Sequence, residues 1–564
     1  MRKIILSISL LFSGTVLSTA QVYSYDELDI NNVRARFFAN GGLFRDSGNP
    51  IPSGGFEVPI GSGSSTIYTS RLWVGGLDNN GQLKLAAERY NQVGRDFFAG
   101  PLTTDGSASC DNTVDSIYNR VWKINRTTID SFATGLFTSV PNSISEWPAH
   151  GDVSLGQSYY LAPFVDLNNN GNYEPENGDY PKMRGDQALF FIFNDKCGIH
   201  TESGGNAIGV EIHGIAYAFN CPQDSALANT IFVHYDIINR GSFTLSNTYI
   251  GLWSDMDIGF ANDDYMQCDV MRGSYFTYNG VNSNYSPSQS VTFLAGPYQD
   301  ENSIDDSVGI GVNESLNGFG FGDGIIDNER LGLSHFMCNN NIGGNGPQAL
   351  NYYYSLEGLN DDGTQLYYGS GNSIPADFIF PGNSDQQYYW GTNGTPVPPW
   401  SEESSSNTPY DRRGLGSSGP FTLQPEEIVP LDLAFVFGRD YNGGPQESIT
   451  VMKERIDAIR SMFISDSTTC GGSISSVQQI ISAQNKVVVY PNPVKDILTV
   501  SCSVPAKEQV IELFNVSGQK VITENVNSIT CKTEINLSAL TSGIYLLRIS
   551  SQNEIIHVQK IIKN

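Results

Sequence analysis

The chain of 564 residues contains 32 Lys or Arg against 59 Asp or Glu, a formal net charge of −27 at pH 7. This balance argues against nucleic-acid binding, because phosphates are bound by clustered Lys and Arg, whereas it suits calcium and solubility outside the cell. The 58 glycines and the many short apolar runs broken by Gly, Asn and Pro are typical of antiparallel β structure with long loops.

Residues 1–20 have the layout of a secretory signal peptide. A short basic start is followed by an apolar stretch over 4–16, and the small residue Ala20 precedes Gln21. That stretch is too short for a membrane span, and no later one reaches the roughly 18 apolar residues that a transmembrane helix needs. We therefore expect the mature chain to begin near Gln21 and to have no transmembrane segment.

The part of the expected mature chain that precedes residue 466 is here called the cargo. Its first region, residues 21–194, has the pattern of a β-rich region. Residues 31–36, 55–59 and 70–76 combine β-branched or aromatic residues with Gly-rich ends, which predicts strands followed by turns.

A candidate calcium loop, DLNNNGNYE, occupies residues 166–174 of this region. It fits the front half of the pattern D-x-[DN]-x-[DN]-G, in which side-chain oxygens converge on one ion and Gly171 permits a sharp turn. The predicted Ca²⁺ ligands are Asp166, Asn168, Asn170, Asn172 (through its carbonyl) and Glu174.

The loop departs from the EF-hand at its last position, where Asn177 stands instead of a bidentate Glu. Glu174, Glu176 or Asp179 would have to substitute, and no flanking helix pair is evident. The alternative is an Asn/Gly turn that adopts left-handed φ angles without a metal.

The second part of the cargo, residues 195–465, is predicted to be β-rich and to end in a helix. Strands are expected at 208–219, 230–238 and 428–437. A helix is expected over about 446–464, because its apolar residues recur every three or four positions; they are Ile449, Met452, Ile456, Ile459 and Phe463.

Two further acidic segments could bind a hard cation. Carboxylates at Asp323, Asp327 and Glu329 could share one ion in a second loop. Asp255 and Asp257, two residues apart on an expected strand, share a face and could act with the acidic pair at 263–264. For this second group, a solvated acidic loop is the preferred interpretation.

Catalytic motifs are mostly missing: the sequence contains no HExxH, no GxSxG and no GxxxxGK[ST]. His213 and His234 fall within predicted strands, where we expect structural roles. A carboxylate pair for glycoside hydrolysis can be assembled from distant positions, and Asp255, Asp257 and Asp264 beside Trp253 are the first suspects. We expect no catalytic site but keep a surface hydrolase as the alternative.

Aromatic residues in the loop-rich part of the cargo suggest ligand binding, since flat rings can stack on sugar faces. Rings also fill β cores, so exposed loop positions are the better candidates. The sequence favours Trp390 and Trp400.

The eight cysteines make disulfides plausible in an exported chain. No CxxC pair occurs, which argues against a thiolate zinc site. Cys197 could pair with Cys221, and Cys502 with Cys531, with free buried thiols as the alternative.

The last part of the chain differs from the rest in charge and pattern. From Lys486 onward eight Lys or Arg face six Asp or Glu, so this part is +2 and the remainder is −29. Seven short apolar runs separated by turn residues predict a small immunoglobulin-like β-sandwich over 486–564. The Gly- and Ser-rich residues before it, 466–485, read as a linker.

Four ordered motifs, at 489–494, 512–521, 543–549 and 558–564, resemble the type A C-terminal sorting domain of the type IX secretion system of Bacteroidetes. The resemblance implies export by the type IX machinery, removal of the sorting domain, and either anchoring of the remaining cargo at the cell surface or its release. The opening of the cargo, with NNVRA, FEVP, LWVGG and RDFFAGP, is similar to that of many secreted proteins with such a tail, a family without an established activity.

The fold class predicted from these patterns is mainly β: an antiparallel β-sandwich-like cargo with long loops and one C-terminal helix, then the small sandwich. The predicted function is that of a secreted outer-membrane-surface or extracellular protein, structural, adhesive or ligand-binding. Calcium would be structural, and a polysaccharide or cell-surface ligand would be the partner besides the secretion machinery.

Overall fold

The computed structural model describes residues 22–46, 54–91, 94–110, 117–281, 286–340, 348–369, 371, 373–472, 474, 487–490, 494–502, 509–515, 519–526, 532–551 and 554–563. The expected signal peptide lies outside them. The chain divides into two compact units, Met1–Ser475 and Ser476–Asn564, which we call the cargo unit and the tail unit.

The largest sheet of the cargo unit has nine antiparallel strands in the order β15-β16-β17-β20-β13-β12-β11-β7, with β8 also paired to β11. Their bounds are β7 (Phe98–Ala99), β8 (Trp122–Asn125), β11 (Gln187–Asn194), β12 (Val210–Ala218), β13 (Thr230–Asn239), β15 (Asp264–Asp269), β16 (Ser274–Asn279), β17 (Ser288–Ala295) and β20 (Ile428–Gly438). The strands predicted at 208–219, 230–238 and 428–437 are β12, β13 and β20.

A second sheet has five strands in the order β18-β19-β14-β5-β6. They are β5 (Thr69–Leu77), β6 (Leu83–Ala87), β14 (Leu245–Asp255), β18 (His335–Asn340) and β19 (Arg412–Leu423). Because β5 pairs with β14, residues on both sides of position 194 share one sheet. The two cargo regions drawn from the sequence are therefore stretches of one compact unit.

One large hydrophobic cluster joins the two sheets. Alternate residues of β13, such as Val233 and Tyr235, and of β20, such as Leu433, share it with Leu72 and Val74 of β5, all at most 1% exposed. Alternation follows from the two-residue period of a strand, which places every second side chain on the same face. The prediction of a mainly β, sandwich-like cargo is confirmed.

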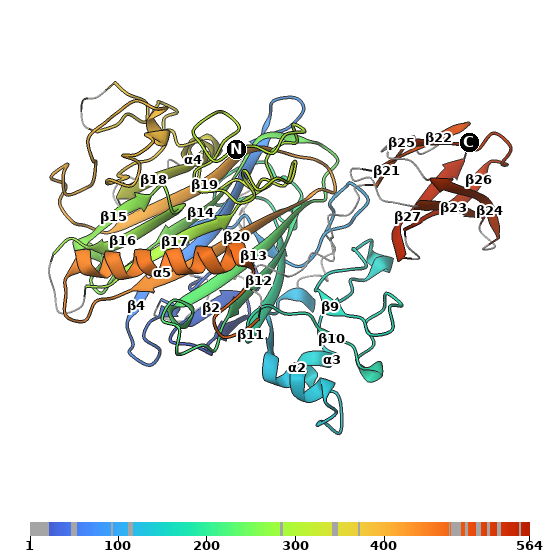
Figure 1. Cartoon of the computed structure of the whole chain (residues 1–564), viewed down its shortest axis with the longest axis horizontal. Helices are drawn as coiled ribbons and strands as arrows, with labels where there is room; N and C mark the ends of the chain where they lie inside the picture. The colour runs from blue at the N-terminus through green and yellow to red at the C-terminus, as the bar shows by residue number, and fades with distance from the viewer. Residues whose placement is uncertain are drawn as a thin grey trace, which may run out of the picture. The chain divides into compact units, whose positions relative to one another are not determined.

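Helices cover both sheets from outside. The predicted helix is α5 (Pro445–Ser465), which contacts β17 and β20 and crosses the nine-stranded sheet in Figure 1. Its buried face holds Ile449, Met452, Ile456, Ile459, Met462 and Phe463. The short helix α4 (Ala349–Leu356) packs Tyr352 and Leu356 against Trp73 and Trp253 of the five-stranded sheet. Among the described helices, none has the length and hydropathy of a membrane-spanning segment.

Two smaller parts complete the cargo unit. A four-stranded sheet is formed by β1 (Tyr25–Leu28), β2 (Arg34–Phe38), β3 (Phe56–Glu57) and β4 (Ser65–Ile67). A lobe at the bottom of Figure 1 contains α2 (Arg126–Ala133), α3 (Asn142–Ser145) and the paired strands β9 (Phe164–Val165) and β10 (Tyr180–Pro181), with 3-10 turns at Val153–Leu155 and Pro175–Asn177. Further 3-10 turns lie at Leu227–Asn229, Ala261–Asp263 and Trp390–Thr392.

Within its described residues the tail unit forms seven strands, as its seven apolar runs predicted. Its three-stranded sheet has the order β21-β22-β25, and its four-stranded sheet has the order β24-β23-β26-β27. The bounds are β21 (Val487–Tyr490), β22 (Ile497–Cys502), β23 (Gln509–Asn515), β24 (Lys520–Val526), β25 (Lys532–Asn536), β26 (Gly543–Ser551) and β27 (Glu554–Lys563). A core of its own includes Leu498, Leu513 and Leu547.

Two disulfides join distant parts of the cargo unit, Cys110–Cys197 and Cys221–Cys470. The predicted pairing of Cys197 with Cys221 is wrong. Cys197 follows β11 and Cys221 follows β12, and because these strands are antiparallel, their C-terminal ends point in opposite directions. Cys531 lies outside the described residues, so the Cys502–Cys531 pair stays a prediction.

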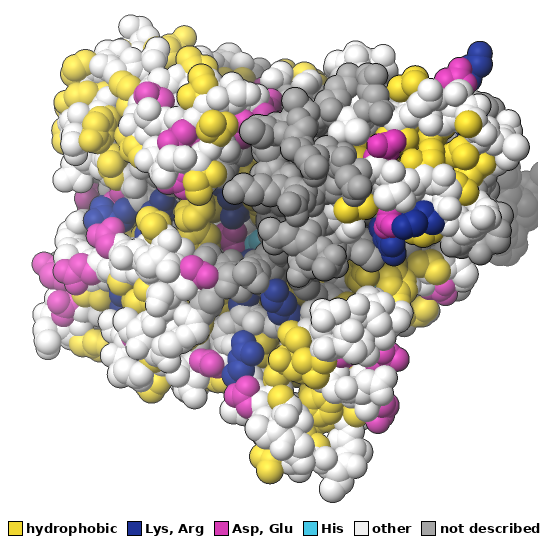
Figure 2. All heavy atoms as spheres, turned by 45° about the vertical axis from the view of Figure 1, so that its right-hand side comes forward, with side chains coloured by type: hydrophobic (Ala, Val, Ile, Leu, Met, Phe, Trp, Pro, Cys, Tyr) yellow, Lys and Arg dark blue, Asp and Glu magenta, His cyan; other side chains and the backbone are white. Residues whose placement is uncertain are grey.

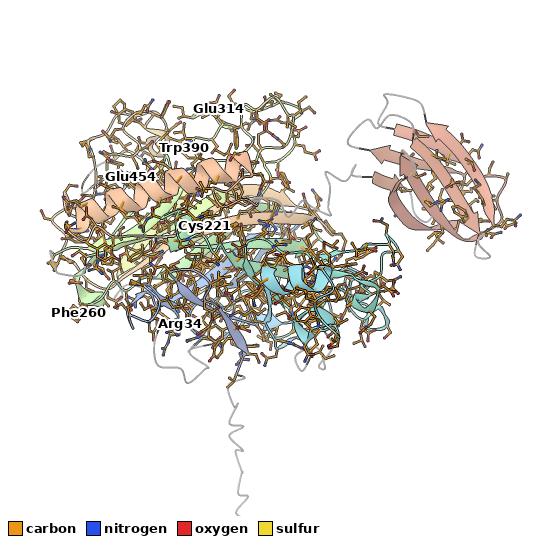
Figure 3. All side chains as sticks on the ribbon, turned by 60° about the horizontal axis from the view of Figure 1, so that its bottom comes forward. Arg34, Cys221, Phe260, Glu314, Trp390 and Glu454 are labelled. Atoms are coloured by element: carbon orange, nitrogen blue, oxygen red, sulfur yellow. A yellow bond between two sulfur atoms is a disulfide. The ribbon has the colours of Figure 1, made fainter. Side chains whose placement is uncertain are left out.

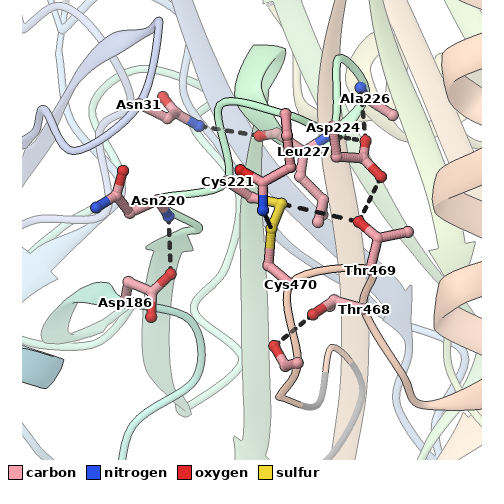
Figure 4. Close-up of a disulfide and its surroundings, with 12 residues drawn as sticks. Asn31, Asp186, Asn220, Cys221, Asp224, Ala226, Leu227, Thr468, Thr469 and Cys470 are labelled. Carbon is pink, nitrogen blue, oxygen red and sulfur yellow. Dashed lines mark hydrogen bonds between the residues drawn. A yellow bond between two sulfur atoms is a disulfide. The ribbon is translucent and has the colours of Figure 1, made fainter.

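The Cys221–Cys470 disulfide also changes the interpretation of the linker. Thr469 Oγ1 donates to Asp224 Oδ2 at 2.6 Å beside it (Figure 4). Ile474 is fully buried, and its carbonyl accepts a hydrogen bond from Tyr217 at 2.9 Å. The first residues of the expected linker are therefore packed against the cargo.

Candidate functional site

The predicted calcium loop connects two short paired strands. β9 and β10 pair with Val165 opposite Tyr180, so residues 166–179 form the connection between them. Asn169 and Gly171 have φ angles of 56° and 80°, in the left-handed region that Asn and Gly adopt most easily. The Asn- and Gly-rich sequence is thus required by the backbone turn itself.

The predicted ligands turn their oxygens back onto this loop. Asp166 Oδ2 accepts a hydrogen bond from Gly171 N at 2.7 Å, and its Oδ1 is buried without a hydrogen-bond partner. Asn168 Oδ1 accepts from Asn170 N at 3.0 Å, and Asn170 Oδ1 from Asn172 N at 2.8 Å. Burial opposes ionisation of Asp166, but the surrounding backbone N–H groups outweigh it and lower the pKa of the carboxyl.

Two more carboxylates close the loop. Glu174 Oε2 accepts hydrogen bonds from the amides of Asn168 at 3.2 Å and Asn170 at 2.5 Å. Asp179 is fully buried and accepts from Leu167 N at 3.0 Å and Glu174 N at 2.9 Å. The loop therefore places three carboxylates in one turn, but their oxygens do not gather within 4.8 Å of one another, a closeness that among the described residues only Asp255, Asp257 and Asp411 reach. Calcium in this loop stays a prediction.

Exposed aromatic residues border the same loop. Tyr159 Oη donates to Asn172 Oδ1 at 2.5 Å, and its ring stacks on His150 with centroids 4.0 Å apart. The Tyr160 hydroxyl lies close to Gly171, where an added Cβ would come within 2.9 Å of it. Tyr159 and Tyr160 are 37% and 57% exposed. Figure 2 shows apolar side chains gathered over the lower lobe, which contains this segment.

The second predicted calcium loop uses its carboxylates at separate points. Asp323 bonds within its own turn. Asp327 Oδ1 accepts from the backbone N–H groups at 302–303, and Glu329 Oε1 accepts from Asp306 N at 2.7 Å. These bonds explain the order of the loop without an ion, and calcium here stays a prediction.

A third acidic group forms a close cluster. Asp255 ends β14, Asp257 follows it, and Asp411 precedes β19; one ligand atom from each lies within 4.8 Å of the others. Among the described residues, this is the group of three His, Cys, Asp or Glu side chains with metal-binding geometry. β14 pairs with β19, Asp255 opposite Arg413, which explains how residues so far apart in the sequence meet.

Arg413 and Tyr90 complete this cluster. Asp255 Oδ2 accepts hydrogen bonds from Tyr90 Oη at 2.8 Å and Arg413 Nη2 at 3.2 Å, and Arg413 also pairs with Asp411. Asp255 is 2% exposed. Burial and the charge of Asp257 raise the pKa of Asp255 to about 7, and burial and the charge of Asp411 raise the pKa of Asp257 to about 6.

The sequence identified Asp255 and Asp257 but not Asp411, Arg413 or Tyr90. The acidic pair at 263–264 that was expected to join them is not part of this group of three. Asp264 is fully buried, accepts from Ile258 N at 3.0 Å, and has a pKa raised well above its usual range, chiefly by burial. No local spacing marks Asp411, because only strand pairing brings it here.

The histidines predicted to be structural have buried charged neighbours. His213 Nε2 lies 2.8 Å from Glu211 Oε1, and His234 Nδ1 lies 2.8 Å from Asp432 Oδ1. Asp432 also pairs with Arg184 and Arg330, both at 2.8 Å. The His234–Asp432 contact joins β13 to β20, whereas His213 and Glu211 both lie on β12.

The prediction of Trp400 as an exposed binding residue is wrong. Trp400 is 9% exposed, its ring packs against Tyr368 and Phe380 with centroids 4.8 and 5.1 Å away, and its Nε1 donates to Ser405. Trp390 is half-buried and packs against Phe378 at 5.8 Å. Trp400 belongs to an apolar cluster formed by the loops, and Trp390 packs against the main core, which is the ordinary role of aromatics in β proteins.

Residues 488–564 match the family model of the secretion system C-terminal sorting domain. None of the curated proteins matches the chain. Among solved structures, a polysaccharide lyase is 7% identical, with a TM-score of 0.17, over 86% of this chain and 44% of its own length. The BSP domain of a biofilm-associated protein is 9% identical, with a TM-score of 0.14, over 96% of this chain and 80% of that one. Scores this low carry no argument about fold or function.

The tail unit is therefore a type IX sorting domain, as its four motifs indicated. A domain of this kind interacts with the type IX secretion machinery. It directs the protein to the cell surface or the extracellular space.

Proposed function

We propose that this exported protein is a structural, adhesive or ligand-binding component of the cell surface, and that calcium orders its binding face. The observation that carries the proposal is the segment 159–179, where an oxygen-rich loop adjoins two exposed tyrosines. A polysaccharide or another cell-surface polymer is the ligand class that such a face suits.

Calcium has a physical role to play in this segment. Leu167 is 58% exposed, and Asn168 and Asn170 are exposed too, so the loop gains little order from apolar burial. An ion that binds the folded loop but not the unfolded one stabilises the folded form in proportion to ln(1 + [L]/Kd). The buried, unpartnered Oδ1 of Asp166 is a free ligand atom for that ion.

The tyrosines supply the contact surface. Tyr160 is 57% exposed, and its hydroxyl lies close to Gly171 of the loop. An aromatic ring offers an apolar face and a polar edge, which matches the apolar face and hydroxyl rim of a sugar ring. Loss of loop order would therefore displace the ring that contacts the ligand.

The test is binding of the full chain to a panel of polysaccharides and cell surfaces, in calcium and in EDTA. Binding should occur in calcium, fall at least tenfold in EDTA, and fall similarly in Asp166→Asn and Tyr160→Ala. Tyr367→Ala is the matched control, because Tyr367 is 47% exposed on another loop. Equal binding in calcium and EDTA, or equal loss in the control, would contradict the proposal.

The alternative function is a surface hydrolase acting on polysaccharide or protein. It is favoured by Asp255 and Asp257, two close carboxyls. Burial and the charge of Asp257 raise the pKa of Asp255 to about 7, and burial and the charge of Asp411 raise the pKa of Asp257 to about 6. Turnover of a polymer by the full chain that disappears in Asp257→Asn, with binding retained, would establish this alternative.

A further inference from the structure

We infer that Asp255, Asp257 and Asp411 form a second cation site, independent of the loop at 166–179, which binds Ca²⁺ and links the end of β14 to the start of β19. The first observation is geometric: one ligand atom from each residue lies within 4.8 Å of the others. Oxygens that bind one Ca²⁺ at about 2.3–2.6 Å can be at most about 4.6–5.2 Å apart. A single calcium ion can therefore contact all three carboxylates.

The second observation is an unsatisfied buried atom. Asp255 is 2% exposed, and its Oδ1 is buried with no hydrogen-bond partner, whereas its Oδ2 is bonded to Tyr90 and Arg413. A buried carboxylate oxygen without a partner costs free energy, because it has lost water and gained nothing in return. A cation in the cluster would supply the missing partner.

Charge points the same way. Asp255, Asp257 and Asp411 are close to one another, and Arg413, which pairs with Asp255 and Asp411, offsets one of the negative charges that the three carry when ionised. Like charges held this close repel unless a cation or protons intervene. A divalent cation neutralises the remainder. Oxygen-only ligands select hard cations such as Ca²⁺ over zinc or copper.

The ion would link three segments of the chain through their carboxylates. Asp255 and Asp411 belong to paired strands, and Asp257 begins the turn that leads to β15. Phe260 in this turn is 63% exposed, and Figure 3 shows it at the outer edge of the cargo unit. Ile258 is buried, whereas the tip of the turn at 259–262 is largely exposed, so an ion held by Asp257 would help to fix the start of the turn.

The test compares melting temperatures of the full chain in calcium and in EDTA, followed by tryptophan fluorescence. Asp166→Asn is present throughout, so that the loop at 166–179 cannot contribute. The test variant is Asp257→Asn. Glu454→Gln is the matched control, since Glu454 is exposed on α5 and projects from it in Figure 3. Each variant removes one negative charge.

The cation site predicts that the two conditions reverse the order of stability. In EDTA, Asp257→Asn should melt about 2–4 °C higher than its parent, because it relieves repulsion. In calcium the parent should rise by more than this difference and overtake the variant. Glu454→Gln should follow the parent in both conditions. A calcium response that is equal in the parent and Asp257→Asn would overturn the site.

Sensitised terbium luminescence gives a second readout that does not depend on stability. Tb³⁺ occupies oxygen-rich calcium sites, and the Trp253 ring lies 5.0 Å from the Tyr90 ring, whose hydroxyl bonds to Asp255. Excitation through tryptophan should give emission that calcium displaces and that Asp257→Asn abolishes. Emission retained in Asp257→Asn, or absent from the parent, would refute the assignment.

Discussion

Removal of the Cys221–Cys470 disulfide should destabilise the cargo unit more than any single core substitution. The bridge closes a loop with a sequence separation of 249 residues, against 87 for Cys110–Cys197. In the chain-entropy treatment, links of these lengths restrict the unfolded chain by about 5.5 and 4.6 kcal/mol at 25 °C. The longer link should therefore contribute about 1 kcal/mol more than the shorter one.

Hydrogen bonds around the disulfide should keep the segment in its folded position when the disulfide is removed. Thr469 still bonds to Asp224, and Ile474 stays anchored by Tyr217, so the folded position of residues 466–474 should persist (Figure 4). The free energy of unfolding lost in Cys221→Ala/Cys470→Ala should therefore come mainly from the greater conformational freedom of the unfolded chain. Gln223 loses its hydrogen bond to the Cys470 sulfur, a small additional cost.

Urea unfolding of the full chain measures this loss without separating the units. All six tryptophans lie between positions 73 and 400, so their fluorescence reports on the cargo unit alone. Cys221→Ala/Cys470→Ala should lose about 5 kcal/mol, and Cys110→Ala/Cys197→Ala about 1 kcal/mol less. A loss below about 1 kcal/mol, or a larger loss for the shorter link, would refute the chain-entropy reasoning.

Three other outcomes are expected. Gly438→Ala should cost about 1–3 kcal/mol in thermal unfolding, because its Cβ would come within 2.4 Å of the Met452 Cβ and 2.6 Å of the Met452 Cα and N on α5; Met452→Ala should not restore the loss, since alanine keeps these three atoms. Glu211 has a pKa lowered to about 2, since its bonds to His213 and Arg240 outweigh burial. Stability from Glu211 is therefore present above about pH 4.5 and lost as pH falls toward 2, on the order of 3 kcal/mol, and Glu211→Gln should flatten this part of an acid titration followed by circular dichroism. Deletion of residues 488–564 should leave the cargo inside the cell envelope, measured by surface protease accessibility; surface display without them would contradict the role of the sorting domain.

Local periodicity predicted the elements whose signal is contained within one segment. The apolar spacing of α5 and the β-branched runs of β12, β13 and β20 appear in the structure within one or two residues of their expected ends. The seven strands of the tail follow the same rule. Each is long or regular enough for burial of one face to decide its conformation.

The sequence failed where distant segments decide the outcome. Cys197 and Cys221 are close in sequence, but each follows the C-terminal end of its strand. Eight residues of β11 pair antiparallel with β12, so these two strand ends lie about 25 Å apart. Trp400 looked exposed because its neighbours are polar and Pro-rich, yet Tyr368 and Phe380 cover it from other parts of the loop. Neither contact leaves a mark in the local pattern.

The two cation candidates differ in this same respect, and the difference has a thermodynamic consequence. The candidate ligands at 166–179 are contiguous, so the unfolded chain retains some of that arrangement and can bind an ion weakly. Asp255 and Asp411 meet only when β14 pairs with β19. An ion in that cluster distinguishes folded from unfolded chain more completely, because binding to the unfolded state reduces the stabilisation that an ion gives. For equal affinities, the cluster at Asp255 should thus stabilise the cargo more than the loop that the sequence made conspicuous.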